Sequence, residues 1–165
     1  MQYNQLTPRI AFNQLLSYER PQAAAWITGN AANPRLSGLV KFYQTTYGGI
    51  LVEAEVFNLP NVTEDASSDF YGMHIHQSGD CSGNFENTGN HYNPMGMEHP
   101  YHAGDMPPLL GNQGYAWMSF YDKRLRMEEI IGKSVVIHDM RDDFTTQPSG
   151  ASGTKIGCGE IRRVI

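Results

Sequence analysis

The sequence predicts an all-β domain, built as an antiparallel sandwich or barrel. Short runs of apolar or alternating residues recur along the chain, and turn-forming Gly, Asn and Pro residues separate them. Two connecting segments are much longer than the others, and one of them carries three of the six histidines. Many short strands joined by long loops are typical of β-sandwiches and β-barrels.

Length and charge exclude several classes of protein. At 165 residues the chain suits one domain with a full core. A formal charge of −5 argues against nucleic acid or an anionic membrane as the main partner. No segment approaches the roughly 20 apolar residues of a membrane span. The start of the chain lacks the pattern of a secretory signal, which predicts a cytoplasmic location, or an extracytoplasmic one if a leader has been removed.

Residues 1–20 differ from the rest and are predicted to be an N-terminal extension of a domain formed by residues 21–165. Thr7 and Pro8 have the chemistry of a cap and a first helical position, so we expect a helix over residues 7–18. Two interpretations of the extension stay open. It packs on a partner subunit, as in a homodimer, or it lies along its own domain.

The remaining residues contain strand-like segments and two long loops. Residues 50–57 alternate most cleanly, with Glu53 and Glu55 facing one way. The loops, residues 77–114 and 139–155, are long for a compact domain unless something orders them, and metal ligands with a disulfide would do so. The predicted strands are residues 23–28, 36–44, 50–57, 70–76, 115–121, 134–138 and 156–165.

The histidines are concentrated in one part of the chain. Five of the six lie within residues 74–105, and the sixth, His138, ends a strand-like run. One metal site, or two adjoining ones, is the simplest cause. His74 and His76 are two apart on a predicted strand, so both rings point to one face with Cα atoms roughly 6.6 Å apart. Taken alone, such a pair is more often two histidines that lie on a surface or in a core without a metal.

A second run of metal-binding residue types follows: His91, His99, His102 and Asp105. Three imidazoles and a carboxylate suit tetrahedral zinc. A set of nitrogen ligands in a tetragonal arrangement suits copper(II) instead. The chain therefore has enough ligands for two different ions. A deprotonated imidazole, with two ring nitrogens, can bridge them.

At these residues the chain resembles the copper–zinc superoxide dismutase family. The short spacing between His99 and His102 resembles that of the bacterial members. The similarity runs from about residue 23 to residue 161. The motifs that carry it are Gly72-Met-His74-Ile-His76 with Gly79-Asp80, Gly89-Asn-His91-Tyr-Asn-Pro94, His102-Ala-Gly-Asp105 with Leu110-Gly111-Asn112, Val136-Ile-His138, and Gly157-Cys158-Gly159.

The resemblance implies an eight-stranded, flattened Greek-key β-barrel, an immunoglobulin-like sandwich with two long functional loops. It also implies two metal ions with His91 as the bridge between them. Asp142 matches the carboxylate that hydrogen-bonds to ligands of both metals. The implied copper ligands are His74, His76, His91 and His138, and the implied zinc ligands are His91, His99, His102 and Asp105.

The reaction that the resemblance implies is the dismutation of superoxide to oxygen and hydrogen peroxide. A redox-cycling copper would be bridged through His91 to a structural zinc, and His91 would pick up and return a proton. We also predict a disulfide between Cys81 and Cys158, which would tie the first long loop to the last strand. Two free buried cysteines are the alternative, and a cytosolic address would make the bridge unusual.

One position departs from the family in a way that bears on activity. Three residues before Cys158, where the family has an arginine beside the copper, this chain has Lys155. We expect Lys155 to guide superoxide, although lysine has a flexible stem and lacks arginine's rigid fork of donors. The alternative is a non-enzymatic zinc- or copper-binding relative with weak or no activity. Met95 and Met97 flank the metal loop and are interpreted as loop packing, with a copper role as the alternative.

Overall fold

The computed structural model describes residue 16, residues 20–60 and residues 69–165. Over these residues the chain is almost entirely β-structure, which confirms the predicted fold class. Two short helices also occur there, the 3₁₀-helix η1 (Gly83–Thr88) and the α-helix α2 (Met127–Ile130). The strands are β1 (Ala23–Gly29), β2 (Ser37–Gln44), β3 (Ile50–Phe57), β4 (Phe70–Tyr71), β5 (Met73–His76), β6 (Leu109–Leu110), β7 (Tyr115–Asp122), β8 (Ser134–His138) and β9 (Lys155–Arg163).

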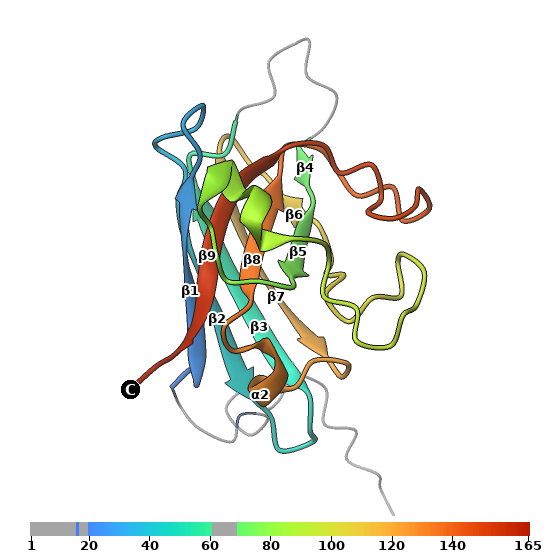
Figure 1. The fold of residues 1–165 in the computed structure, drawn as a ribbon. Coiled ribbons are helices and arrows are strands. Elements are labelled where there is room, and N and C mark those ends of the chain that lie inside the picture. Colours follow the sequence, from blue (N-terminus) through green and yellow to red (C-terminus); the bar gives the residue numbers. More distant parts are fainter. Residues whose placement is uncertain (1–15, 17–19, 61–68) are drawn as a thin grey trace, which may run out of the picture.

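The strands form one curled sheet and one small second sheet (Figure 1). The large sheet is antiparallel in the order β5-β8-β9-β1-β2-β3-β7, and β4 pairs with β6. β4 continues into β5 across Gly72, and β6 leads into β7, so the small sheet connects the two edges of the large one. Counted as one strand interrupted at Gly72, β4 and β5 bring the described strands to the expected eight. The Greek-key path stays a prediction.

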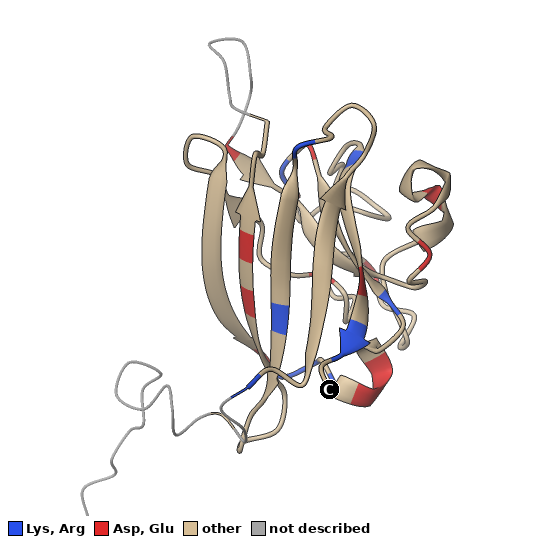
Figure 2. Ribbon diagram, turned by 90° about the vertical axis from the view of Figure 1, so that its left-hand side faces the viewer, with Lys and Arg blue, Asp and Glu red and all other residues tan. Residues whose placement is uncertain are grey.

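Alternation along the strands builds the core, and β3 shows how. Its inward side chains are fully buried, and each Ile or Val among them contributes about 1.5–3 kcal/mol by leaving water. Glu53 and Glu55 lie on the outer face, as predicted, where Figure 2 shows two acidic positions along one strand beside a basic position on its neighbour. The buried side chains of β3 on the inner face are Ile50, Val52, Ala54 and Val56.

The strands that carry histidines are buried on both faces. On β5, Met73 and Ile75 enter the core, whereas His74 and His76 alternate with them on the opposite face. On β8, His138 lies close to both of these rings. This outer face would be exposed in a bare barrel, but here the two long loops cover it. The barrel and its loops together therefore enclose a polar layer outside the apolar core.

The predictions for the N-terminal residues stay predictions. The helix expected over residues 7–18 falls outside the described residues, apart from Leu16, which forms an isolated antiparallel bridge with Thr45. The division into an extension and a domain stays a prediction, and so does the homodimer. Among the described residues, helices that could cross a bilayer are absent.

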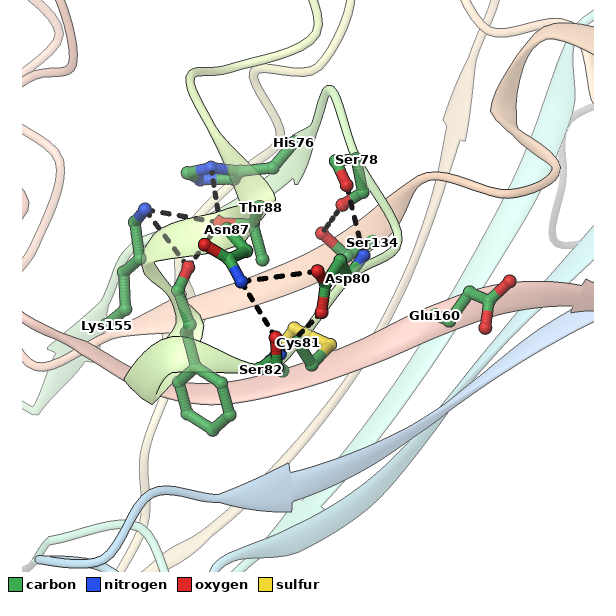
Figure 3. Close-up of a disulfide and its surroundings, with 12 residues drawn as sticks. His76, Ser78, Asp80, Cys81, Ser82, Asn87, Thr88, Ser134, Lys155 and Glu160 are labelled. Atoms are coloured by element: carbon green, nitrogen blue, oxygen red, sulfur yellow. Dashed lines mark hydrogen bonds between the residues drawn. A yellow bond between two sulfur atoms is a disulfide. The ribbon is translucent and has the colours of Figure 1, made fainter.

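The predicted Cys81–Cys158 disulfide is present, with the two Cα atoms 5.8 Å apart. It joins the first long loop to β9 (Figure 3). It packs against Phe85 and Val136 in a small apolar cluster of its own. One end of the loop that leads to the histidines is thereby fixed to the barrel.

Removing the disulfide should destabilise the protein. The bridge closes a segment of 77 residues, for which loop-closure entropy gives about 4.5 kcal/mol, and measured values are usually about 2–4 kcal/mol. We expect C81A/C158A to lower the free energy of unfolding of the metal-free chain by about 2–4 kcal/mol in urea titrations. Reduced wild-type protein should behave like the variant. Equal midpoints for the variant and the oxidised wild-type chain would contradict this.

Candidate metal centre

The predicted ligands come together in two adjoining groups. In each group, one ligand atom per residue lies within 4.8 Å of every other, and every member is buried. His91 belongs to both groups. The first group is His74, His76, His91 and His138, and the second is His91, His99, His102 and Asp105.

Backbone pairing draws the loop residues to the strand. His91 bridges to His76 and Asp105 bridges to His74, each as an isolated antiparallel pair beside β5. Gly104 makes this approach possible, because its carbonyl accepts from Ile75 N at 2.9 Å and an added Cβ would lie 2.3 Å from Ile75 O. The loop ligands are thus positioned by main-chain contacts that require glycine at position 104.

In the first group the hydrogen bonds fix which ring nitrogen carries the proton. Nδ1 of His76 donates to Gly89 O at 2.8 Å, and Nδ1 of His138 lies 3.4 Å from Gly153 O. Because carbonyls only accept, Nε2 of each ring is left with a lone pair, and these two nitrogens face each other at 3.3 Å. Nε2 of His91 and Nδ1 of His74 are buried and have no hydrogen-bond partner.

The second group shows the same pattern around a carboxylate. Nδ1 of His91 donates to Asp105 Oδ1 at 2.7 Å. Asp105 Oδ2 accepts from the His102 backbone N at 3.0 Å. It also lies 3.1 Å from His99 Nδ1 and 3.4 Å from His102 Nδ1, two buried nitrogens that have no hydrogen-bond partner.

A buried nitrogen without a hydrogen-bond partner lowers the stability of the folded chain unless a ligand binds it. A cation in each group would satisfy them, so the residues present fit two metal ions. The donor atoms agree with two different ions. The first group offers only nitrogen ligands, which suit copper(II). The second offers three imidazoles and a carboxylate, which suit zinc.

Three rings of the first group, those of His74, His76 and His138, are held in the form that binds metals. Burial lowers the pKa of His74 to about 4 and that of His138 to about 3, and it lowers the pKa of His76 well below its ordinary value. These imidazoles are therefore neutral near pH 7, and a neutral imidazole is the ligand form.

Asp105 and Asp142 stay ionised. Burial alone would raise the pKa of both carboxyl groups, but hydrogen bonds and charges from neighbouring histidines outweigh it and lower both values. Asp142 accepts from His74 Nε2 at 2.8 Å through Oδ2 and from His99 Nε2 at 2.8 Å through Oδ1. One carboxylate thus connects the two groups, at the position that the sequence predicts.

Two residues of the second long loop were missed by the sequence analysis. Gln147 pairs with both backbone groups of His99: its Oε1 accepts from His99 N at 3.0 Å and its Nε2 donates to His99 O at 2.7 Å. Gly150 has a φ of +68°, and an added Cβ would lie 2.0 Å from Asp142 Oδ1. The Pro-Ser-Gly run around position 150 was a signal of a turn, but no local pattern indicates these contacts.

A cavity leads from the surface to three members of the first group. Its lining includes His76, His91, His138 and Lys155. The Lys155 Nζ donates to Thr88 Oγ1 at 3.2 Å (Figure 3). It also donates to the carbonyls of Phe85 and Gly89 at 3.3 Å. Its side chain is only 15% exposed, so the stem is held in place rather than flexible as expected from the sequence.

Gly150→Ala should disrupt the hydrogen bonds by which Asp142 connects the two groups of ligands. The new methyl group displaces the Asp142 carboxylate, so His74 and His99 lose their shared acceptor. Outer partners of this kind typically affect metal affinity 10–100-fold, and we expect a loss of zinc affinity in that range in chelator competition. Gly132→Ala is the control, because Gly132 has a φ of +78° and open space at its Cβ. Equal zinc affinity in the two variants would contradict the role of Gly150.

The chain matches proteins of one family. The family described as copper/zinc superoxide dismutase matches residues 36–161. The chain is 34% identical over 142 residues to an extracellular Cu-Zn superoxide dismutase of Oryctolagus cuniculus, covering 79% of this chain and 57% of that protein. It is 30% identical over 159 residues to a copper chaperone for superoxide dismutase of Sus scrofa, covering 88% of this chain and 55% of that protein. It thus spans a little over half the length of these relatives.

A bacterial relative is matched along its length. The Cu-Zn superoxide dismutase of Legionella pneumophila is 29% identical over an alignment of 161 residues, covering 93% of this chain and 93% of that protein. Among solved structures, the clock protein EA4 superposes with a TM-score of 0.74 at 26% identity, covering 89% of this chain and 98% of that one. An SOD-like protein from Bacillus subtilis gives 0.69 at 25% identity, covering 83% and 96%. The chain therefore belongs to the copper/zinc superoxide dismutase family.

Proposed function

We propose that this protein converts superoxide to oxygen and hydrogen peroxide. The observation that carries the proposal is the sharing of His91 between an all-nitrogen group and a nitrogen-and-carboxylate group, because the two groups suit two different ions that one imidazole can bridge. Family membership supports it, since relatives named as Cu-Zn superoxide dismutases are among the matches.

The proposed ligands are those of the two groups. Copper would be held by His74, His76, His91 and His138, and zinc by His91, His99, His102 and Asp105. When bound, copper supplies one-electron redox chemistry, and zinc supplies fixed positive charge without redox chemistry. The protein fixes the ligands, through Asp142 from behind and through Gly89 O on His76.

His91 is proposed to move the proton that the reaction consumes. Two superoxide ions and two protons give one oxygen and one hydrogen peroxide, so a proton donor is needed at the site. Nδ1 of His91 is held by Asp105, whereas its Nε2 has no partner, and the residue lines the cavity. Nε2 is therefore the atom at which His91 can take a proton and give it to a small anion.

Lys155 is proposed to attract that anion. Its ammonium is fixed at the cavity, two contacts away from His76, because Thr88 Oγ1 lies 3.4 Å from His76 Nδ1. A local positive charge can raise the association rate of an anion 10–10³-fold, and salt weakens the effect. Its donors already have acceptors and Glu86 lies 3.9 Å away, so it attracts superoxide better than it positions it.

The second candidate function is metal binding with weak or no dismutase activity. The occupied donors of Lys155 favour it, and so does the match to copper chaperones. The disulfide favours a compartment in which thiols stay oxidised. A superoxide dismutation assay of the copper- and zinc-loaded chain separates the candidates. Rapid dismutation supports the first, and a fully loaded but inactive chain supports the second.

The two groups should lose their metals separately. We expect the loaded wild-type chain to hold one copper and one zinc. His74→Ala should lose copper and keep zinc, because His74 belongs only to the first group, and Asp105→Ala should lose zinc first. Elemental analysis after dialysis measures both. A wild-type chain that holds a single metal, or variants that lose both metals together, would contradict two separate sites.

Lys155 variants should change the rate and its dependence on salt. Lys155→Glu should slow dismutation strongly, because it reverses the charge, and Lys155→Ala should slow it moderately, because it removes the charge. Lys155→Arg should hold or raise the rate, because arginine keeps the positive charge and adds a rigid fork of donors. Lys123→Ala removes an exposed lysine elsewhere and is the control for net charge. Rates at matched copper content are compared over a range of ionic strength. If Lys155→Ala keeps both the rate and its salt dependence, Lys155 does not guide the anion.

A further inference from the structure

One exposed methionine, Met97, lines the cavity, and a second, Met95, lies two residues earlier in the same loop; the proposed reaction uses neither. Met97 is part of the cavity lining together with His76, His91 and His138, and its side chain is 48% exposed. Met95, two residues earlier in the same loop, is 79% exposed. Packing of the loop, which the sequence analysis expected, does not account for side chains this open to solvent.

The turn that carries them is well fixed. Met97 N donates to Asn93 Oδ1 at 2.9 Å, and Asn93 Nδ2 donates to Met97 O at 2.8 Å. Asn93 itself lines the cavity and follows His91 by two residues. The backbone therefore holds Met97 at the mouth of the cavity, while its side chain keeps its freedom.

The chemistry of a thioether is selective. Methionine sulfur is soft and polarisable, so it binds copper(I) and has little affinity for the harder ions that carboxylates and water prefer. Exposure also falls from Met95 to Met97, and then to His138, which lines the same cavity as Met97 and is 4% exposed. A copper(I) ion would thus meet thioether sulfur in solvent before it meets imidazole nitrogen inside.

We propose that Met97, assisted by Met95, is a transfer site that binds copper(I) at the mouth of the cavity and passes it to His76 and His138. The proposal deepens the proposed function and rests on it, because it needs copper to be the ion of the first group. No change of oxidation state is required at the methionines. The ion exchanges sulfur ligands for nitrogen ligands.

Silver(I) tests the site directly, because it shares the ligand preference of copper(I) and does not change oxidation state. Zinc is first loaded into both histidine groups, so that the imidazoles are occupied by a diamagnetic ion. Silver(I) is then added to protein with ¹³C-labelled methionine methyl groups. We expect the signals of Met97 and Met95, assigned with Met97→Leu and Met95→Leu, to shift first. A shift of Met140, which is also 48% exposed, at the same silver concentration would overturn the proposal.

Copper uptake tests the transfer. Zinc-loaded, copper-free chain receives copper(I) from a chromogenic chelator without oxygen. We expect M95L/M97L to take up copper about tenfold more slowly, equivalent to about 1.4 kcal/mol of activation free energy, and to reach the same final content. Met140→Leu should match the wild-type rate. Uptake by M95L/M97L at the wild-type rate would overturn the proposal. A wild-type chain that takes up no copper would instead contradict the proposed function, and the silver result would still decide the methionine site.

Discussion

The centre of this molecule depends on buried nitrogen lone pairs that face one another. Nε2 of His76 and Nε2 of His138 lie 3.3 Å apart, and each ring places its other nitrogen against a carbonyl. His99 Nδ1 meets a carboxylate oxygen at 3.1 Å in the same way. A nitrogen lone pair that faces another lone pair or a carboxylate oxygen is repelled by it in a buried site. A cation turns each repulsion into attraction, which explains why long loops can close over this face of the barrel.

The rest of the structure keeps that arrangement in place from behind. β5 and β8 supply three of the rings on one rigid surface, and their other face is the apolar core. The disulfide anchors the first long loop, and Asp142 with Gln147 anchors the second loop to the first. Behind the ligands, main-chain carbonyls or the Asp142 carboxylate hold one ring nitrogen of four histidines, His74, His76, His99 and His138. The other nitrogen is thereby directed toward the metal position.

Sequence reasoning succeeded where a residue acts through its own chemistry or a regular spacing. Histidine spacing on a strand placed His74 and His76 on one face, and the motif around His102 and Asp105 indicated the second group. It failed where a residue acts through a distant backbone. Gln147 and Gly150 matter because the fold brings them to His99 and Asp142, and neither belongs to a periodic pattern. β6, two residues inside a long loop, is too short for alternation to reveal.

The shared position of His91 is the central claim, and crystals of the copper- and zinc-loaded chain test it most directly. Anomalous scattering measured on both sides of the copper and zinc absorption edges locates each element separately. We predict copper among His74, His76, His91 and His138, zinc among His91, His99, His102 and Asp105, and the His91 ring between them. A single metal position, or two positions of which one lies away from His91, would contradict the account.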